Sequence, residues 1–186
     1  MKRTLIAAGA VVLAGSFASF TAPASAEETV CRGTLGAVTV DNLLVPEQAS
    51  CTLEGTVVQG TVQVARGAVL RSTGAQIVGN VQAEGHRNVV LRGGRVGGSV
   101  QLHQGGAAVV ARVAVTADIQ ADENTRAISL QANRVGGSVQ VVANTGGATI
   151  TSNRINGNLQ CKENVPAPTG SGNVVGGVKE DQCARF

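Results

Sequence analysis

The sequence predicts an all-β fold, a single-stranded parallel β-helix (β-solenoid) of about seven or eight coils. The main observation is a repeated unit of six residues. In order, its positions hold an apolar residue, a variable residue, a residue that is usually Gly, a small polar residue, a second apolar residue and Gln. Its copies occupy residues 58–63, 77–82, 96–101, 115–120, 135–140 and 155–160, with a degenerate copy at 174–179. A period of 19 or 20 residues without long insertions indicates stacked repeats. Coils of this length with irregular corners favour right-handed winding.

Apolar and polar residues alternate within each coil, which is typical of strands. Val100 and Leu102 are expected to point inward and Gln101 outward. Two further inward sets follow along the coil: Leu70, Val89, Ala108, Ile128 and Ala148, and then Ser72, Leu91, Val110, Leu130 and Ile150. Because Gly and Asn tolerate left-handed backbone conformations, they mark the turns between two or three short strands per coil. Such turns are expected at Gly93, Gly94, Asn133 and Asn153.

The first 26 residues have the pattern of a secretory signal peptide. Lys2 and Arg3 precede an apolar run from Leu5 to about Phe20. Ala24-Ser25-Ala26 follows, a site of the kind that signal peptidase cleaves. We therefore expect a secreted or extracellular protein, with the periplasm or the cell surface as alternatives, and no membrane insertion once the signal is removed. Residues 27–186 are expected to form one domain. Its parts are an N-terminal cap and first coil (27–57), regular coils (58–160) and a C-terminal cap (161–186).

Charge and aromatic content argue against some partners. The 15 basic residues less Lys2 and Arg3 leave 13, against 12 acidic residues. This balance offers no general attraction for nucleic acid. The chain has no Trp or Tyr, and Phe186 is its one Phe after residue 26, so platforms on which bases or sugars stack are missing. We predict no nucleic-acid partner and no cofactor.

Four cysteines in an exported chain indicate two disulfides. Cys31 and Cys51 lie near the start, and Cys161 and Cys183 lie near the end. Of the three possible connectivities, pairing within each end is favoured because the middle coils contain no Cys. Each bridge would close a loop of roughly 20 residues and stabilise the fold by about 3 kcal/mol. A cysteine metal site is not expected, since no Cys-x-x-Cys pair is present.

The C-terminal segment carries a family resemblance. The run Gly157-Asn158-Leu159-Gln160-Cys161-Lys162-Glu163-Asn164 is followed by Pro166-Ala167-Pro168 and by Lys179-Glu180-Asp181-Gln182-Cys183. This ending resembles that of a group of exported bacterial proteins with no assigned activity, and the resemblance covers essentially the whole chain after residue 26. In its short coils without loops, the chain is also loosely similar to the polymer-forming bactofilins, which typically lack a signal peptide and disulfides.

The most regular outward feature is a column of glutamines that end the repeated units: Gln63, Gln82, Gln101, Gln120, Gln140 and Gln160. Stacked at strand spacing, their amides can hydrogen-bond to one another, as in ladders of stacked sheets. The alternative is a flat polar face that binds glycan hydroxyls or another rod. Small polar residues accompany it at Thr61, Asn80, Ser99, Ser138 and Asn158. Ice binding would need a regular array of Thr, which only Thr149 and Thr151 resemble.

A second cluster emerges when the coils are aligned. Glu84, His103 and Asp122 each fall three positions after an inward residue, and His86 is two residues from Glu84. We expect the first three to stack on successive coils. Two imidazoles and two carboxylates within reach of one another would ligate a divalent metal or act as an acid and a base. The alternative is a solvated corner with no chemical role.

Three arginines, Arg95, Arg134 and Arg154, each precede the first apolar residue of a unit. Arg134 and Arg154 are expected to be neighbours on adjacent coils. Adjacent like charges are unfavourable unless an anion lies between them. An anionic polysaccharide site and a set of solvated corners are the two hypotheses for this position.

The sequence contains no nucleophile with a His partner, no phosphate-binding loop and no long insertion that would wall a pocket. We therefore expect a non-catalytic protein that acts through its surface, in a structural, adhesive, or cell-envelope- or matrix-associated role. Its expected partners are cell-wall or extracellular polysaccharide, or further copies of itself. The rival hypothesis is a polysaccharide-binding or polysaccharide-active protein of the lyase or hydrolase kind. A secreted inhibitor or effector is a third.

Overall fold

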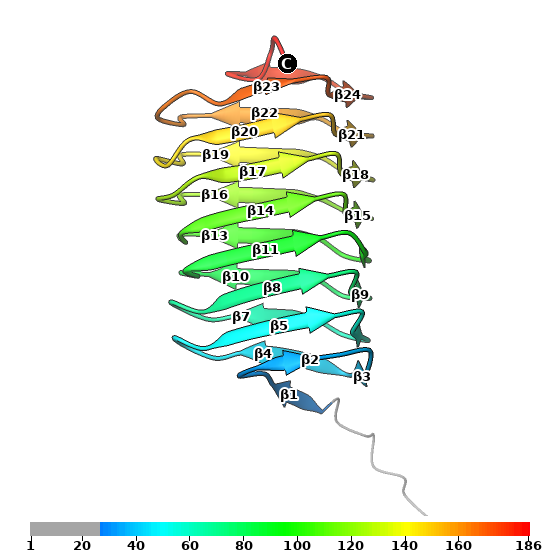
Figure 1. Ribbon diagram of the computed structural model, residues 1–186. Coiled ribbons are helices and arrows are strands. Elements are labelled where there is room, and N and C mark those ends of the chain that lie inside the picture. The colour runs from blue at the N-terminus through cyan, green and yellow to red at the C-terminus, as the bar shows by residue number, and fades with distance from the viewer. Residues whose placement is uncertain (1–26) are drawn as a thin grey trace, which may run out of the picture.

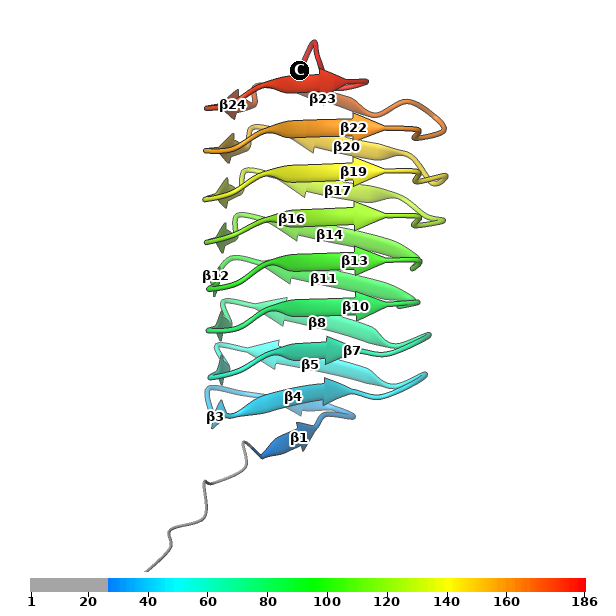
Figure 2. The same cartoon turned by 180° about the vertical axis from the view of Figure 1, so that it is seen from behind.

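The computed structural model describes residues 27–186, which wind into a right-handed parallel β-helix. In Figure 1 the front strands run from left to right and the rear strands run back, while the chain rises from its N-terminal to its C-terminal coil. Figure 2 shows the same sense of winding from behind. The predicted all-β solenoid and its right-handed winding are confirmed. The predicted signal peptide, residues 1–26, lies outside the described residues.

Three parallel sheets form the sides of the rod, and each coil adds one strand to each sheet. Sheet A contains β1 (Glu28–Val30), β4 (Asn42–Val45), β7 (Val62–Val64), β10 (Val81–Glu84), β13 (Val100–His103), β16 (Ile119–Asp122), β19 (Val139–Val142), β22 (Leu159–Lys162) and β25 (Lys179–Asp181). Sheet B contains β2 (Thr34–Leu35), β5 (Ser50–Glu54), β8 (Val69–Thr73), β11 (Asn88–Arg92), β14 (Ala107–Ala111), β17 (Ile128–Gln131), β20 (Ala148–Thr151) and β23 (Thr169–Ser171). Sheet C contains β3 (Thr39–Val40), β6 (Val57–Val58), β9 (Gln76–Ile77), β12 (Arg95–Val96), β15 (Ala114–Val115), β18 (Arg134–Val135), β21 (Arg154–Ile155) and β24 (Val174–Val175).

The core consists of columns of equivalent aliphatic residues stacked coil upon coil. Val100 pairs with Ile119, and Ile119 with Val139, so the period lengthens from 19 to 20 residues at that point. All three predicted inward sets are buried. Because burial of a large aliphatic side chain contributes roughly 2 kcal/mol, these columns are the main source of stability in a core without aromatic rings.

The N-terminal cap is itself a coil of the solenoid. Strands β1, β2 and β3 pair with β4, β5 and β6, one in each sheet. The Cys31–Cys51 disulfide joins the first two coils, with the two Cα atoms 5.5 Å apart. The predicted pairing of cysteines within each end is confirmed here and at the other end, where Cys161 is bonded to Cys183.

The C-terminal coil differs from the predicted repeat by one residue. Leu159 pairs with Lys179, whereas the degenerate unit had placed Val178 opposite Leu159. The physical reason is that the last coil keeps the 20-residue period of the two before it, which leaves Val178 exposed. The Lys179 ammonium donates to the main-chain oxygen of Phe186, whose ring packs against the end of the core.

The turns between sheets B and C require one correction. Gly93 and Gly94 have positive φ angles, as predicted. In the later coils, however, the left-handed residue is Ala132, with φ 54°, which precedes Asn133. The same holds before Asn153, so Asn at these corners is not chosen for its backbone tolerance. Its side chain is buried and makes hydrogen bonds instead.

No helix long and apolar enough to cross a membrane occurs in residues 27–186.

Candidate binding surfaces

The outer face of sheet A, here called the glutamine face, carries one glutamine on each of six consecutive strands. The six lie in direct register: Gln63, Gln82, Gln101, Gln120, Gln140 and Gln160. Gln82 donates to Gln101 at 3.1 Å, and Gln101 donates to Gln120 at 3.3 Å. Gln160 donates to Glu180 at 3.2 Å, but within residues 27–186 the side chains of Gln63 and Gln140 make no hydrogen bond. The predicted column is confirmed, and hydrogen bonds join only part of it.

A depression of about 410 Å³ lies on the N-terminal half of the glutamine face. The amides of Gln63, Gln82 and Gln101 border it, together with Glu84 and His103. Each amide both donates and accepts hydrogen bonds, as a ligand hydroxyl does. The surface therefore suits a ligand rich in hydroxyl groups.

Small polar side chains at the corner between sheets C and A form a ladder of their own. Asn80 Oδ1 accepts a hydrogen bond from the Ser99 amide of the next coil at 2.8 Å, and Asp118 Oδ1 accepts one from Ser138 at 2.7 Å. The full series of acceptors is Asn42, Thr61, Asn80, Ser99, Asp118, Ser138 and Asn158. In each of the residues predicted to accompany the glutamine face, a side-chain oxygen thus accepts a hydrogen bond from the next coil and helps to hold successive coils together.

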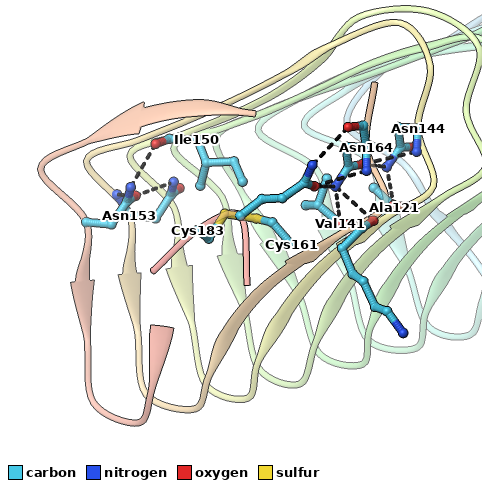
Figure 3. Close-up of a disulfide and its surroundings, with 11 residues drawn as sticks. Ala121, Val141, Asn144, Ile150, Asn153, Cys161, Asn164 and Cys183 are labelled. Carbon is cyan, nitrogen blue, oxygen red and sulfur yellow. Dashed lines mark hydrogen bonds between the residues drawn. A yellow bond between two sulfur atoms is a disulfide. The ribbon is translucent and has the colours of Figure 1, made fainter. Parts of the chain in front are cut away.

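Two buried asparagine ladders hold the corners of the C-terminal coils, shown beside the C-terminal disulfide in Figure 3. One comprises Asn124, Asn144 and Asn164, and the other Asn133, Asn153 and Asn173. Asn144 Nδ2 donates to the Ala121 carbonyl at 2.8 Å and to Asn164 Oδ1 at 2.9 Å. Sequence reasoning missed the first ladder, although Asn recurring every 20 residues at a turn was a usable signal.

Glu84, His103 and Asp122 lie side by side on β10, β13 and β16, as predicted. His103 Nδ1 is 3.3 Å from Asp122 Oδ2. Burial raises the pKa of Asp122, while the charge of nearby His103 lowers it and that of Glu123 raises it further. The arrangement is a carboxylate and imidazole pair able to share a proton, next to a second carboxylate at the edge of the depression.

His86 is not part of this cluster. Gly85, with φ 60°, turns the chain so that the imidazole lies inside the corner, only 2% exposed. Burial lowers the pKa of His86, and the backbone of Ala83 and Ala107 offsets this only in part. Neither ring nitrogen has a hydrogen-bond partner in the described chain. His86 is therefore kept apart from the other three residues considered as metal ligands. Residues 27–186 contain no group of three or more His, Cys, Asp or Glu side chains that could hold a metal ion.

The three predicted arginines lie on the outer face of sheet C. Arg134 and Arg154 are directly paired, and Ala114 separates Arg134 from Arg95. A second depression, of about 300 Å³, runs between them and is here called the arginine groove.

No protein-family model matches the chain, and neither a curated protein nor a solved structure matches it.

Proposed function

We propose that this protein is an exported, non-catalytic β-solenoid that acts through its surface, as an adhesive or structural component of the cell envelope or extracellular matrix. The observation that carries the proposal is the glutamine face, with six identical amides in register on consecutive strands. Neighbouring strands are about 4.8 Å apart, so the same donor and acceptor pair recurs at a regular interval. Such an array matches a partner that also repeats, such as a cell-wall or extracellular polysaccharide.

Binding along this face is expected to be weak at each coil and strong over several. A single amide exchanges water for a ligand hydroxyl with little net gain in free energy. A polymer held at one coil presents its next unit at high effective concentration, so that further contacts add affinity. The free amide of Gln140 supplies one such contact without breaking the ladder.

Export is supported by the two disulfides, because such bonds persist in oxidising compartments outside the cytosol. They join the first two coils and the last two, where the stack would otherwise fray.

Co-sedimentation of the mature, oxidised protein with purified envelope fractions and insoluble neutral polysaccharides tests the proposal. A Gln120→Lys/Gln140→Lys variant places two charges in the glutamine face and is expected to weaken binding about fivefold or more. Gln131→Lys/Thr149→Lys is the matched control, since it adds the same two charges at exposed positions of sheet B. A wild-type protein that stays monomeric in sedimentation and binds neither envelope nor polysaccharide would contradict the proposal.

A polysaccharide-active protein is the second candidate, and one contact favours it. The 3.3 Å approach of His103 to Asp122, beside Glu84 and the larger depression, offers an acid and a base next to a glycan-sized surface. New reducing ends or unsaturated products on incubation with glycans, lost in His103→Ala, would replace the non-catalytic proposal with this one.

A further inference from the structure

We propose that the arginine groove on sheet C binds a linear acidic glycan, a polysaccharide carrying carboxylate or sulfate groups. The inference rests on the proposed surface-acting function, because it names a class of polymer for that function. It assigns this polymer to a different face of the rod from the glutamine face.

The three arginines are exposed and aligned along the rod. Arg134 and Arg154 occupy directly paired positions on β18 and β21, so their Cα atoms are about 5 Å apart. Arg95 lies two coils before Arg134, at roughly twice that spacing. Like charges on directly opposed strand positions repel one another. The row is therefore a place where an anion stabilises the protein.

No carboxylate within the rod neutralises these charges. The two ion pairs found in residues 27–186 involve no arginine. Sheet C and the residues that lead into it, over 92–96, 112–116, 132–136 and 152–156, contain no Asp or Glu. Two further arginines lie in these segments, Arg92 at the end of β11 and Arg112 directly after β14. Asp118 follows β15, but its Oδ1 already accepts the Ser138 amide at 2.7 Å. The positive charge is left for solvent ions or a ligand.

Small residues make the floor of the groove and leave it open. Ala114 interrupts the row of arginines, and Gly136 borders the same depression. A β-carbon on Gly136 would lie 2.1 Å from the carbonyl oxygen of Thr116, so a side chain cannot fill this place. Arg95 Nη2 lies 3.3 Å from Thr116 Oγ1, which draws its guanidinium toward the coil of Ala114.

This geometry leaves space for an anionic group above Ala114, between Arg95 and Arg134. A guanidinium presents a planar pair of donors that fits a carboxylate or sulfate. The Thr116 hydroxyl and the Asn156 amide line the same depression and can bind neutral hydroxyls. Cationic and neutral hydrogen-bonding groups side by side in one groove match the charges and hydroxyls of an acidic glycan.

A nucleic acid fits this groove less well. Its lining contains no aromatic residue, and the described chain has no Trp or Tyr on which a base would stack. The nearly balanced charge of residues 27–186 also supplies little of the wider positive field on which nucleic-acid binding depends. Duplex DNA is therefore the polyanion control.

The experiment measures binding of the mature, oxidised protein to immobilised polygalacturonate and heparin, with dextran and duplex DNA beside them, at low and at physiological salt. Polygalacturonate reports carboxylates and heparin reports sulfates. The first variant is Arg134→Gln/Arg154→Gln. Its matched control is Arg66→Gln/Arg71→Gln, which removes the same charge from outside the groove. A second variant, Ala114→Glu, keeps every arginine and places a carboxylate on the floor.

We expect the wild type to bind at least one acidic glycan more tightly than dextran or DNA. Both groove variants should lose about tenfold or more in affinity, while the control pair stays within about twofold and all variants keep the wild-type melting temperature. Equal loss in the control pair, equal binding to DNA, or no binding to either acidic glycan would overturn the inference. Acidic-glycan binding that persists in the groove variants would also overturn it, while leaving the proposed surface-acting function, which rests on the glutamine face, in place.

Discussion

A β-carbon on Gly105 would lie 2.2 Å from Cε1 and Nδ1 of the buried His86 ring. The two residues occupy the same corner on successive coils, and the imidazole fills the space that a side chain at 105 would need. Gly105 does not have a positive φ angle, so space alone requires glycine here. Its amide donates to Asn124 Oδ1 of the following coil at 3.0 Å, where the buried asparagine ladder begins.

Gly105→Ala is therefore expected to lower the free energy of unfolding by about 1–3 kcal/mol through overpacking. In a His86→Ala background the same substitution should be much less harmful, because the ring it would strike is gone. Urea denaturation of the four proteins in this double-mutant cycle measures the coupling. Gly33→Ala is the control, since nothing lies within 4 Å of a β-carbon there. An equal loss in both backgrounds would contradict the steric account.

Stability should fall on mild acidification because of His86. Burial lowers the pKa of His86 below its ordinary value of 6.5, so the unfolded chain binds this proton more readily than the folded chain does. As far as His86 is concerned, the free energy of unfolding thus has its full value above about pH 6.5 and decreases as the pH falls below that value. Urea titrations between pH 7.5 and 5.5 (about neutral to mildly acidic) should show this slope in the wild type and in His103→Ala. The slope should be absent in His86→Asn, and its persistence there would refute the assignment.

Asn144→Ala should destabilise the protein far more than the small number of side-chain atoms it removes would suggest. The Asn144 side chain donates to Ala121, Val142 and Asn164 and accepts from Asn124. Its removal leaves buried backbone groups unpaired, and we expect a loss of at least about 2 kcal/mol. Thr149→Ala, on an exposed position of β20, should change stability by less than about 0.5 kcal/mol. Similar losses in the two variants would show that the ladder adds little.

The Cys161–Cys183 bond should be a main support of the C-terminal end. It closes a loop with a sequence separation of 22 residues, for which chain entropy gives a stabilisation of about 3 kcal/mol. Cys161→Ala/Cys183→Ala should unfold at correspondingly lower urea, and reduction of the wild type with a thiol, which also opens Cys31–Cys51, should lower its unfolding midpoint further still. If oxidised and reduced wild type unfold at the same urea concentration, the bond has no such effect.

The asparagine corners show where inference from sequence ended. The periodic units indicated how often a turn occurs, and Gly93 and Gly94 do adopt the expected left-handed conformations. Asn133 was expected to do the same, but Ala132 takes that role and Asn133 donates from a buried amide to Val110. A sequence pattern indicates that a polar residue lies at a corner, but not whether its side chain points to solvent or to the interior.

The histidines show the same limit at the candidate site. Glu84, His103 and Asp122 stack because equal spacing places residues of a solenoid in one column. The repeat length alone is enough to predict this. His86 was grouped with them through its nearness in sequence, yet the turn at Gly85 buries it. Spacing along the chain does not report the direction of a side chain beyond a turn.

The sequence favoured disulfide pairing within each end because the middle coils contain no Cys. By itself it determined the all-β solenoid, its coil length, the inward columns, and the glutamine and arginine rows. These follow from periodicity, because in a stack of coils a fixed spacing becomes a fixed register. Only the tertiary structure decided the corners: which polar side chains hold the coils together, where His86 lies, and that Ala114 and Gly136 leave a groove between the arginines. Turn geometry sets these features. It depends on the backbone angles of single residues, and those angles leave no periodic trace in the sequence.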